Sequence, residues 1–193
     1  MSLESALERY PKDIKLKDGS KCTLRVLEPG DTKALNEFFI AMAHEDLLFL
    51  KHRMTDPAVV RKWCEHIDHG EDFVLLAVRD NQILGEITLH QQLGGWKRHI
   101  GDVTVHVHPS FRGKHLARTL IAEIIEIGRE CGLERLETEF IGKQKGAMKM
   151  FGLFGFSELM RLNDYVKDMQ ATKHDYVLMG MRIVTDEEYA GMG

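Results

Sequence analysis

The stretch from His108 to Ala117 constrains this chain more than any other, because it joins a strand pattern directly to a long helix pattern. Before it, valines at every second position alternate with polar residues, which is the period of a strand. After it, apolar residues recur at helical spacing: Leu116, Leu120, Ile124 and Ile127. The sequence therefore predicts a strand, a short turn and an amphipathic helix that ends near Cys131-Gly132.

The turn between this strand and helix has the composition of an anion-binding site. A helix N-terminus leaves several backbone N–H groups without partners, and Arg112 and Lys114 add positive charge beside Gly113. Backbone donors, the helix dipole and these cations together favour a phosphate or a pyrophosphate. An ordinary solvated connection is the alternative interpretation, because many α/β proteins have a basic turn at this place.

Length and composition are those of one globular domain. The chain has 193 residues, of which 44% are hydrophobic and 29% are charged, so it can bury a substantial core. A net charge of −4 favours neither nucleic acid nor an anionic membrane as a partner, and no stretch reaches the ~18 apolar residues of a membrane span. Cys22, Cys64 and Cys131 form no CxxC motif, which suits a reducing cytoplasm. We expect a cytoplasmic α/β domain over residues 21–184, an N-terminal arm over 1–20 and a tail over 185–193.

The order of the other expected elements is mixed. Strands are expected at 22–28, 73–78, 83–90, 135–141, 156–166 and 176–184, and further helices near 31–43, 56–67 and 146–154. Strands that follow one another in pairs, with helices between the groups, favour an α+β layer structure over a regular doubly wound sheet.

The turn Arg112-Gly-Lys-His-Leu-Ala117 resembles motif A of the GNAT superfamily of acyl-CoA-dependent N-acyltransferases, whose pattern is Gln/Arg-x-x-Gly-x-Gly/Ala. Arg112 and Ala117 match, whereas His115 stands where the family usually has glycine. The element order is also similar, so the resemblance covers about residues 21–184. It implies the GNAT fold, a mixed and mostly antiparallel seven-stranded sheet that is V-shaped at its centre and flanked by about four helices.

A second family landmark is a short helix that ends in Gly-Phe. The family often has Asn-x-x-Ala-x-x-x-Tyr-x-x-x-Gly-Phe, and this chain has Gln144, Ala147, Phe151, Gly155 and Phe156 at those places. The tyrosine that usually acts as general acid is therefore missing. The strand from Asp102 onward is most similar to the acetyltransferase domains of bacterial protein-lysine acetyltransferases, which often carry a glutamate in that register.

The resemblance implies an enzyme that moves an acetyl group from acetyl-CoA directly to an amine, without a covalent enzyme intermediate. Its pyrophosphate is expected over the backbone of the turn, and a backbone N–H of the preceding strand is expected to stabilise the oxyanion. The residues expected to bind the cofactor are Val105, His106, Val107, Arg112, Gly113, Lys114, His115, Leu116, Ala117, Gln144 and Phe151. We expect CoA binding to be retained despite His115, because its backbone N–H is still present.

An amine nucleophile must lose a proton before it attacks. For a lysine-like amine with a pKa of about 10.4, reaching the neutral form at pH 7 costs about 4–5 kcal/mol, so a general base is worth seeking. Asp102 and His106 share strand parity and oppose the valine face, while Glu86 lies on the preceding strand. By register Asp102 is the first candidate for the base, followed by Glu86 and His106. Polar residues on a partly solvated sheet face are the alternative for each.

The sequence leaves the acceptor and the exact role open. The acceptor is a protein lysine or a small-molecule amine, and the chain is a monomer or a homodimer. The rival interpretation is a non-catalytic acyl-CoA-binding sensor or regulatory module, and a third is an interaction domain that has lost the cofactor. No metal is expected, since the pairs His66/His69 and His106/His108 lack a further ligand at a recognised zinc spacing.

Overall fold

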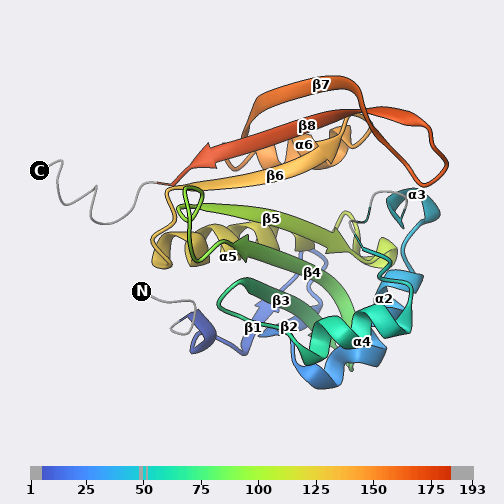
Figure 1. The fold of residues 1–193 in the computed structure, drawn as a ribbon. Coiled ribbons are helices and arrows are strands. Elements are labelled where there is room, and N and C mark those ends of the chain that lie inside the picture. Colours follow the sequence, from blue (N-terminus) through green and yellow to red (C-terminus); the bar gives the residue numbers. More distant parts are fainter. Residues whose placement is uncertain (1–5, 48–49, 51, 184–193) are drawn as a thin grey trace, which may run out of the picture.

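A computed structural model describes residues 6–183 except 48, 49 and 51, and its strands form one mixed sheet (Figure 1). The order across the sheet is β1-β2-β3-β4-β5-β6-β8-β7. The strands are β1 (Lys12–Lys15), β2 (Lys21–Val26), β3 (Asp72–Arg79), β4 (Gln82–Gln91), β5 (Ile100–Val107), β6 (Arg135–Ile141), β7 (Ser157–Lys167) and β8 (Lys173–Arg182). Neighbouring strands pair antiparallel except β5 and β6, which are parallel. The expected α+β architecture is confirmed.

The sheet has eight strands where seven were expected. The additional strand, β1, lies within the segment expected to be an arm and pairs with β2 through Lys12↔Leu24 and Ile14↔Cys22. Three of its four residues are charged and it occupies the edge of the sheet, so it lacks the alternating apolar pattern by which strands are found in a sequence. The expected tail, residues 185–193, lies outside the described residues.

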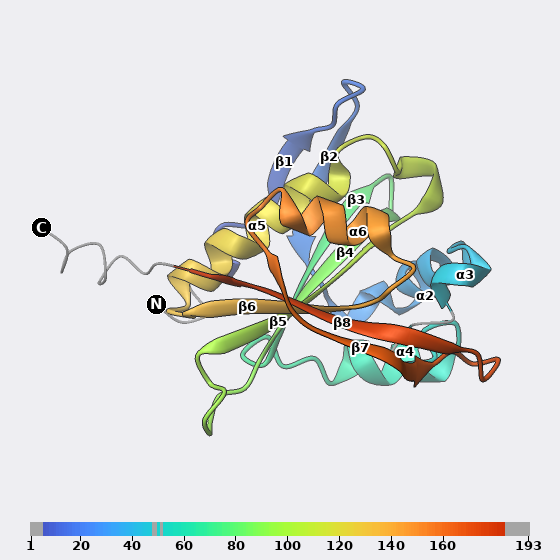
Figure 2. The ribbon, with the colours of Figure 1, turned by 90° about the horizontal axis from the view of Figure 1, so that it is seen from above.

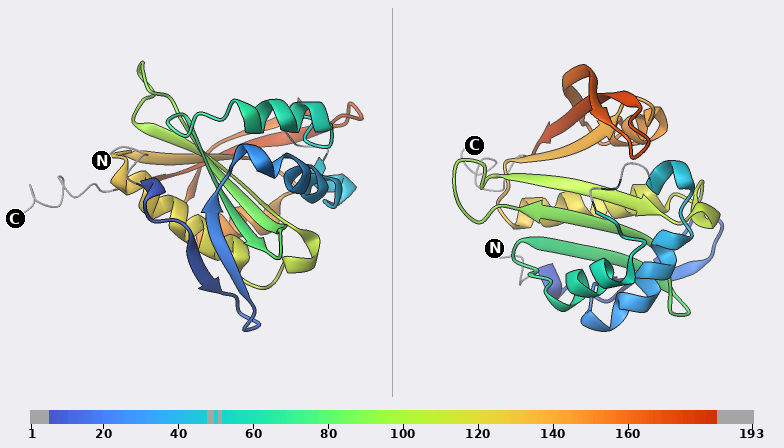
Figure 3. Two further views of the ribbon diagram at one scale, coloured as in Figure 1. Left: turned by 90° about the horizontal axis from the view of Figure 1, so that it is seen from below. Right: turned by 45° about the vertical axis from the view of Figure 1, so that its right-hand side comes forward.

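Helices cover both faces of the sheet (Figures 2 and 3). Helices α5 (Leu116–Glu130) and α6 (Lys145–Gly152) lie on one face, and helices α2 (Thr32–Ile40) and α4 (Pro57–Glu65) lie on the other. The short elements are η1 (Pro29–Asp31), α3 (His44–Leu47) and η2 (Pro109–Phe111). Each face has its own buried apolar cluster, the larger one under α5 and α6 and the smaller one under α2 and α4. The sheet is therefore the middle of three layers.

The packing of α5 fixes which way the side chains of β5 point. Gly101 and Val103 are buried in the cluster beneath α5, so the alternate residues Asp102, Thr104 and His106 belong to the opposite face. Glycine is required at position 101, because a Cβ there would lie within 3.0 Å of side chains of Leu89, Leu133 and Leu136. The strand and the helix that the sequence predicted around residues 103–130 are both present.

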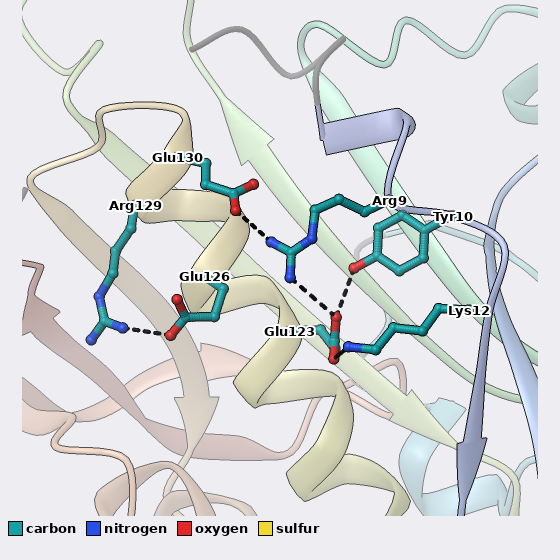
Figure 4. Close-up of polar contacts among 7 residues, drawn as sticks. All are labelled: Arg9, Tyr10, Lys12, Glu123, Glu126, Arg129 and Glu130. Carbon is teal, nitrogen blue, oxygen red and sulfur yellow. Dashed lines mark hydrogen bonds and ion pairs between the residues drawn. The ribbon is translucent and has the colours of Figure 1, made fainter. Parts of the chain in front are cut away.

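The segment before β1 is attached to α5 through the carboxylate of Glu123 (Figure 4). The Tyr10 hydroxyl donates to Glu123 at 3.0 Å, and Lys12 forms an ion pair with the same carboxylate. Arg9 reaches Glu130, one further turn along the helix, at 2.6 Å. Burial and the charge of Glu123 raise the pKa of Tyr10 well above its usual range. These contacts hold the first strand of the sheet against the middle of α5.

Within the described part of the chain, no helix is long and apolar enough to cross a membrane.

Candidate active site

The sheet opens at its centre, between β5 and β6. These two strands pair at Ile100↔Arg135, Gly101↔Leu136 and Asp102↔Glu137, and the pairing does not continue beyond this point in the described residues. On its other side β5 stays paired with β4 as far as Val107. The backbone of β5 from Val103 to Val107 therefore lacks a strand partner on the side of β6, which leaves donors and acceptors there for another group.

The turn that follows β5 has an unusual backbone. Gly113 has a φ of 74°, and His115, the residue directly before α5, has a φ of 68° and lies in the left-handed region. That conformation is accessible to glycine at no cost, whereas a side chain costs roughly 1 kcal/mol there. This explains physically why glycine is favoured at position 115. The chain nevertheless forms the turn with histidine, a residue that enters this region more readily than most.

The two cations of the turn already have intramolecular partners. Arg112 forms an ion pair with Asp46 on α3, and Lys114 lies 3.0 Å from Asp18. The ammonium of Lys114 also lies over the ring of Phe111, 4.8 Å from its centroid. Both ion pairs are partly exposed, so each contributes little to stability and can exchange its acidic partner for another anion.

A basic cavity of about 530 Å³ lies at the N-terminal end of α5. Its lining residues come from the end of β1 and the residues after it, from the turn and first turns of α5, and from the segment after α6. They are Lys15, Leu16, Lys17, His115, Arg118, Thr119, Ala122, Glu123 and Phe154. Three of these, Lys15, Lys17 and Arg118, are cations that the sequence did not point to. Arg118 was detectable, because it lies one turn of helix after His115, but the two lysines come from the end of β1 and the turn after it, far earlier in the chain.

The two cofactor candidates on α6 have structural partners. The Gln144 side chain accepts a hydrogen bond from the backbone N–H of Ile141 at 2.9 Å, which closes the turn before the helix. Phe151 is 1% exposed, and its ring packs edge-on against Phe140 and Phe156. Phe151 thus belongs to the core beneath α6, and no other described group replaces the missing tyrosine hydroxyl at this position.

A polar row crosses the opposite face of the sheet where β4 faces β5. Glu86 is opposite His106. The carboxylate of Glu86 is hydrogen-bonded to Nδ1 of His106 at 2.8 Å and accepts from the hydroxyl of Thr88. Glu86 is 2% exposed and the side chain of His106 is 24% exposed. The ring of Phe39, on α2, packs edge-on against His106 with centroids 5.6 Å apart. The carboxylate and the imidazole that the sequence proposed separately therefore form one hydrogen-bonded pair.

A second carboxylate–imidazole pair lies further along the same face. His90, opposite Asp102 on β5, bonds through Nδ1 to Asp72 at 2.6 Å. Burial lowers the pKa of His90, but the hydrogen bond and the charge of Asp72, helped by Asp102, outweigh it and leave that pKa above the ordinary value. This imidazole is thus held close to two carboxylates.

Asp102 lines an acidic cavity of about 270 Å³ at the point where β5 and β6 part. The cavity is lined by His90, Gln91, Gln92, Lys97, Ile100, Asp102, Glu137, Glu139 and Leu178. Sequence reasoning missed Glu137 and Glu139, although they alternate with buried Leu136 and Thr138 and therefore have to face away from α5. Asp102 and His106 are four residues apart on one strand, which separates their backbones by about 13 Å. Their side chains therefore cannot contact the same atom of a substrate.

The residues that the structure describes form no metal centre. Among them no group of three or more His, Cys, Asp or Glu side chains is arranged to hold a metal ion. His108 has a local role, since its Nδ1 accepts from the backbone N–H of Ser110 at 3.2 Å. Burial and the neighbouring Arg112 lower the pKa of His108.

Comparison with known proteins gives one family. The family model described as "Acetyltransferase (GNAT) family" matches residues 36–156. The L-amino acid N-acyltransferase MnaT of Escherichia coli (strain K12) is 27% identical over 77 residues, which are 37% of this chain and 45% of that protein. The chain thus spans less than half the length of this curated relative.

Solved structures give the same fold. The GNAT domain of PAT from S. lividans superposes with a TM-score of 0.72 at 17% identity, covering 89% of this chain and 96% of that one. YncA from Salmonella typhimurium, solved with its cofactor acetyl-CoA, superposes with a TM-score of 0.72 at 18% identity, covering 86% of this chain and 95% of that one.

Proposed function

This chain belongs to the GNAT acetyltransferase family, and we propose that it transfers an acetyl group from acetyl-CoA directly to a positively charged amine. One observation carries the proposal. The sheet opens between β5 and β6, with a basic cavity on the side of α5 and an acidic cavity on the opposite face. The anionic cofactor and a cationic amine can thereby approach the sheet from opposite faces.

The cofactor side fits a ligand rich in phosphate. The N-terminus of α5 supplies backbone donors, and Lys15, Lys17 and Arg118 line the adjoining cavity. When phosphate binds, Arg112 and Lys114 can leave their partly exposed acidic partners and turn to the new anion. That YncA was solved with acetyl-CoA supports this choice of cofactor.

The free edge of β5 fits the acyl end of the cofactor. Amides of the pantetheine arm can pair with a strand edge that has lost its neighbour, as β5 has after Asp102. A backbone N–H among Val105, His106 and Val107 then stabilises the oxyanion as the amine attacks, an effect worth roughly 3–4 kcal/mol in other enzymes. Acetyl-CoA supplies the activated acyl group and a thiol as leaving group. With an ordinary thiol pKa of about 8.5, that group can leave without the missing tyrosine.

The charge of the acceptor side argues for a cationic amine. Asp102, Glu137 and Glu139 line one small cavity, and only Lys97 and His90 among its lining residues can offset them. Such a cavity attracts an ammonium group and repels a carboxylate. The α-amine of a free amino acid, the acceptor class in the name of MnaT, carries a carboxylate two bonds away. We therefore propose an amine without an adjacent carboxylate, which is the chemistry of a lysine side chain or a small polyamine.

A non-catalytic acyl-CoA sensor is the second candidate function. Two observations favour it: the burial of Phe151 where the family has a tyrosine, and the ion pairs that occupy Arg112 and Lys114. The sensor and the enzyme both bind acetyl-CoA, but only the enzyme forms an N-acetylated product.

Thermal unfolding with acetyl-CoA, CoA and ATP tests the cofactor proposal. A ligand at 100 times its dissociation constant adds about 2.7 kcal/mol of stability, which raises Tm by about 5–10 °C for a chain of this size. We expect this rise with acetyl-CoA and CoA and a much smaller one with ATP. No rise with either CoA compound would remove both candidate functions.

A further inference from the structure

We propose that His106 is the general base of this reaction and that the buried carboxylate of Glu86 is the residue that positions it. The inference rests on the proposed function and adds to it the group that takes the proton. It replaces Asp102, the first candidate by sequence register, with a pair that only the register between β4 and β5 brings together.

The imidazole is held on two sides. Glu86 accepts from Nδ1 of His106 at 2.8 Å, and the ring of Phe39 packs edge-on against the other side. Glu86 is held in turn by the buried hydroxyl of Thr88, which donates to its second oxygen. Each carboxylate oxygen of Glu86 thus has one side-chain hydrogen-bond partner.

This arrangement selects one tautomer. An ionised carboxylate can only accept, so Nδ1 carries the proton and Nε2 presents a lone pair. Among the described residues no hydrogen bond to Nε2 of His106 is formed, and a quarter of the side chain is accessible. A buried carboxylate that orients an imidazole in this way also stabilises the imidazolium after it takes a proton.

The proposed reaction transfers one proton from the amine to the leaving thiolate by way of His106. The bound ammonium first releases one proton to solvent and becomes a neutral amine. As the amine nitrogen forms its bond to the acetyl carbon, the carbonyl electrons move to oxygen and Nε2 of His106 takes a second proton from that nitrogen. When the carbonyl is restored, the bond from carbon to sulfur breaks and the thiolate leaves with that electron pair. The imidazolium then gives its proton to the thiolate, and His106 is neutral again.

Position favours this pair over the similar pair of His90 and Asp72. His90 is opposite Asp102, the last residue at which β5 still pairs with β6. His106 lies beyond that point, where the edge of β5 is free and where the proposed oxyanion donors are located. An imidazole also suits proton transfer near neutral pH better than a carboxylate, whose ordinary pKa is about 4.

Few other ionisable groups face this ring. From β4 the facing group is Glu86, and from α2 the facing side chain is the apolar ring of Phe39. The next ionisable side chains on this face are His108, two residues further along the chain, and His90 and Asp102, which lie four residues along their strands. A general base must be unprotonated to act, so catalysis by His106 gives the pH–rate profile an acidic limb that depends on this residue.

The test compares His106→Gln and Glu86→Gln with His90→Gln, a matched loss of a carboxylate-bonded imidazole on the same sheet face. We expect His106→Gln to lower kcat on the order of 100-fold and to remove the limb, with acetyl-CoA affinity unchanged. Glu86→Gln lowers kcat about tenfold, because the imidazole loses the carboxylate that orients it. His90 lines the acceptor cavity, so His90→Gln changes KM for the amine, but it keeps the acidic limb of the natural protein.

A nitrogen-15 NMR titration of the imidazoles gives a readout that needs no turnover and that also serves if Glu86→Gln unfolds. We expect His106 to carry its proton on Nδ1 in the unmodified protein. A proton on Nε2, or an unchanged limb in His106→Gln, overturns the assignment while leaving acetyl transfer intact. A protein that acetylates no amine at all removes the proposed function, and the base with it.

Discussion

Asp102 lies opposite Glu137 at the last position where β5 and β6 pair, and the sheet is open beyond these two carboxylates. The free backbone edge of β5 begins after this pair of residues, and both residues line the acidic cavity. That cavity therefore lies apart from His106. The proposed division of labour follows from this geometry. Asp102 and its neighbours attract the cationic acceptor to the opening of the sheet, and His106 takes a proton from the amine after the amine has moved along β5 to the acyl group.

Replacing Asp102 with asparagine separates attraction from proton transfer. We expect Asp102→Asn to raise KM for a cationic amine about tenfold, because one of three carboxylates in the cavity is lost, while acetyl-CoA affinity is unchanged. The acidic limb of the pH–rate profile should persist. Steady-state kinetics across pH measure both quantities, and a lost limb would make Asp102 the base.

Arg118 offers a test of the basic cavity. It lies in the first turn of α5 and lines that cavity, so Arg118→Ala should weaken acetyl-CoA binding about five- to tenfold and reduce its dependence on salt. Arg129→Ala is the matched control, since Arg129 lies in the last turn of the same helix and pairs with Glu126. Calorimetric titration at two salt concentrations measures the difference. Equal losses in both variants would contradict the assignment of the cavity.

The backbone at His115 predicts a stabilising substitution. Because His115 has a φ of 68°, His115→Gly should raise the free energy of unfolding by about 1 kcal/mol and leave acetyl-CoA affinity equal or higher. His115→Ala removes the imidazole but keeps the strain, so it should show no such gain. Denaturant unfolding and a binding titration measure both effects. A large loss of affinity in both variants would show instead that the imidazole binds phosphate.

The contacts of Glu123 predict how much the attachment of the N-terminal segment contributes to the stability of the fold. Its side chain is 12% exposed and carries the contacts with Tyr10 and Lys12, so Glu123→Ala should cost about 1–3 kcal/mol and lower Tm by several degrees. Glu126→Ala, which removes only an exposed pair with Arg129, should cost less than about 0.5 kcal/mol. Thermal unfolding compares them, and equal effects would contradict the role of the Glu123 cluster.

The sequence predicted the parts of the site that depend on local pattern. The alternation before His108 and the helical stripe after it located β5, the turn and α5, and strand parity placed Asp102 and His106 on one face. The sequence did not indicate the register in which neighbouring strands pair. The bond between Glu86 and His106 depends on how β4 aligns with β5, and neither strand alone specifies that alignment.

The missed residues have a similar cause. Lys15 and Lys17 reach the cavity of α5 because β1, a short and charged edge strand, pairs with β2, and no periodicity marks such a strand. The ion pairs of Arg112 with Asp46 and of Lys114 with Asp18 join residues far apart in the chain. Contacts of this kind arise from tertiary packing, so local pattern alone cannot predict them.

The most direct test of the account measures acetyl transfer to two acceptors that differ in one group, L-methionine and L-methioninamide. Both present the same α-amine and side chain, but only methionine carries the carboxylate that the acidic cavity should repel. With acetyl-CoA present, product formation followed by mass spectrometry should give a KM at least about tenfold lower for the amide, since about 1.4 kcal/mol of repulsion suffices for that ratio. KM is compared because the less basic amine of the amide raises kcat by itself. Faster transfer to methionine, or no transfer to either compound or to a lysine peptide, would contradict a cationic-amine acetyltransferase.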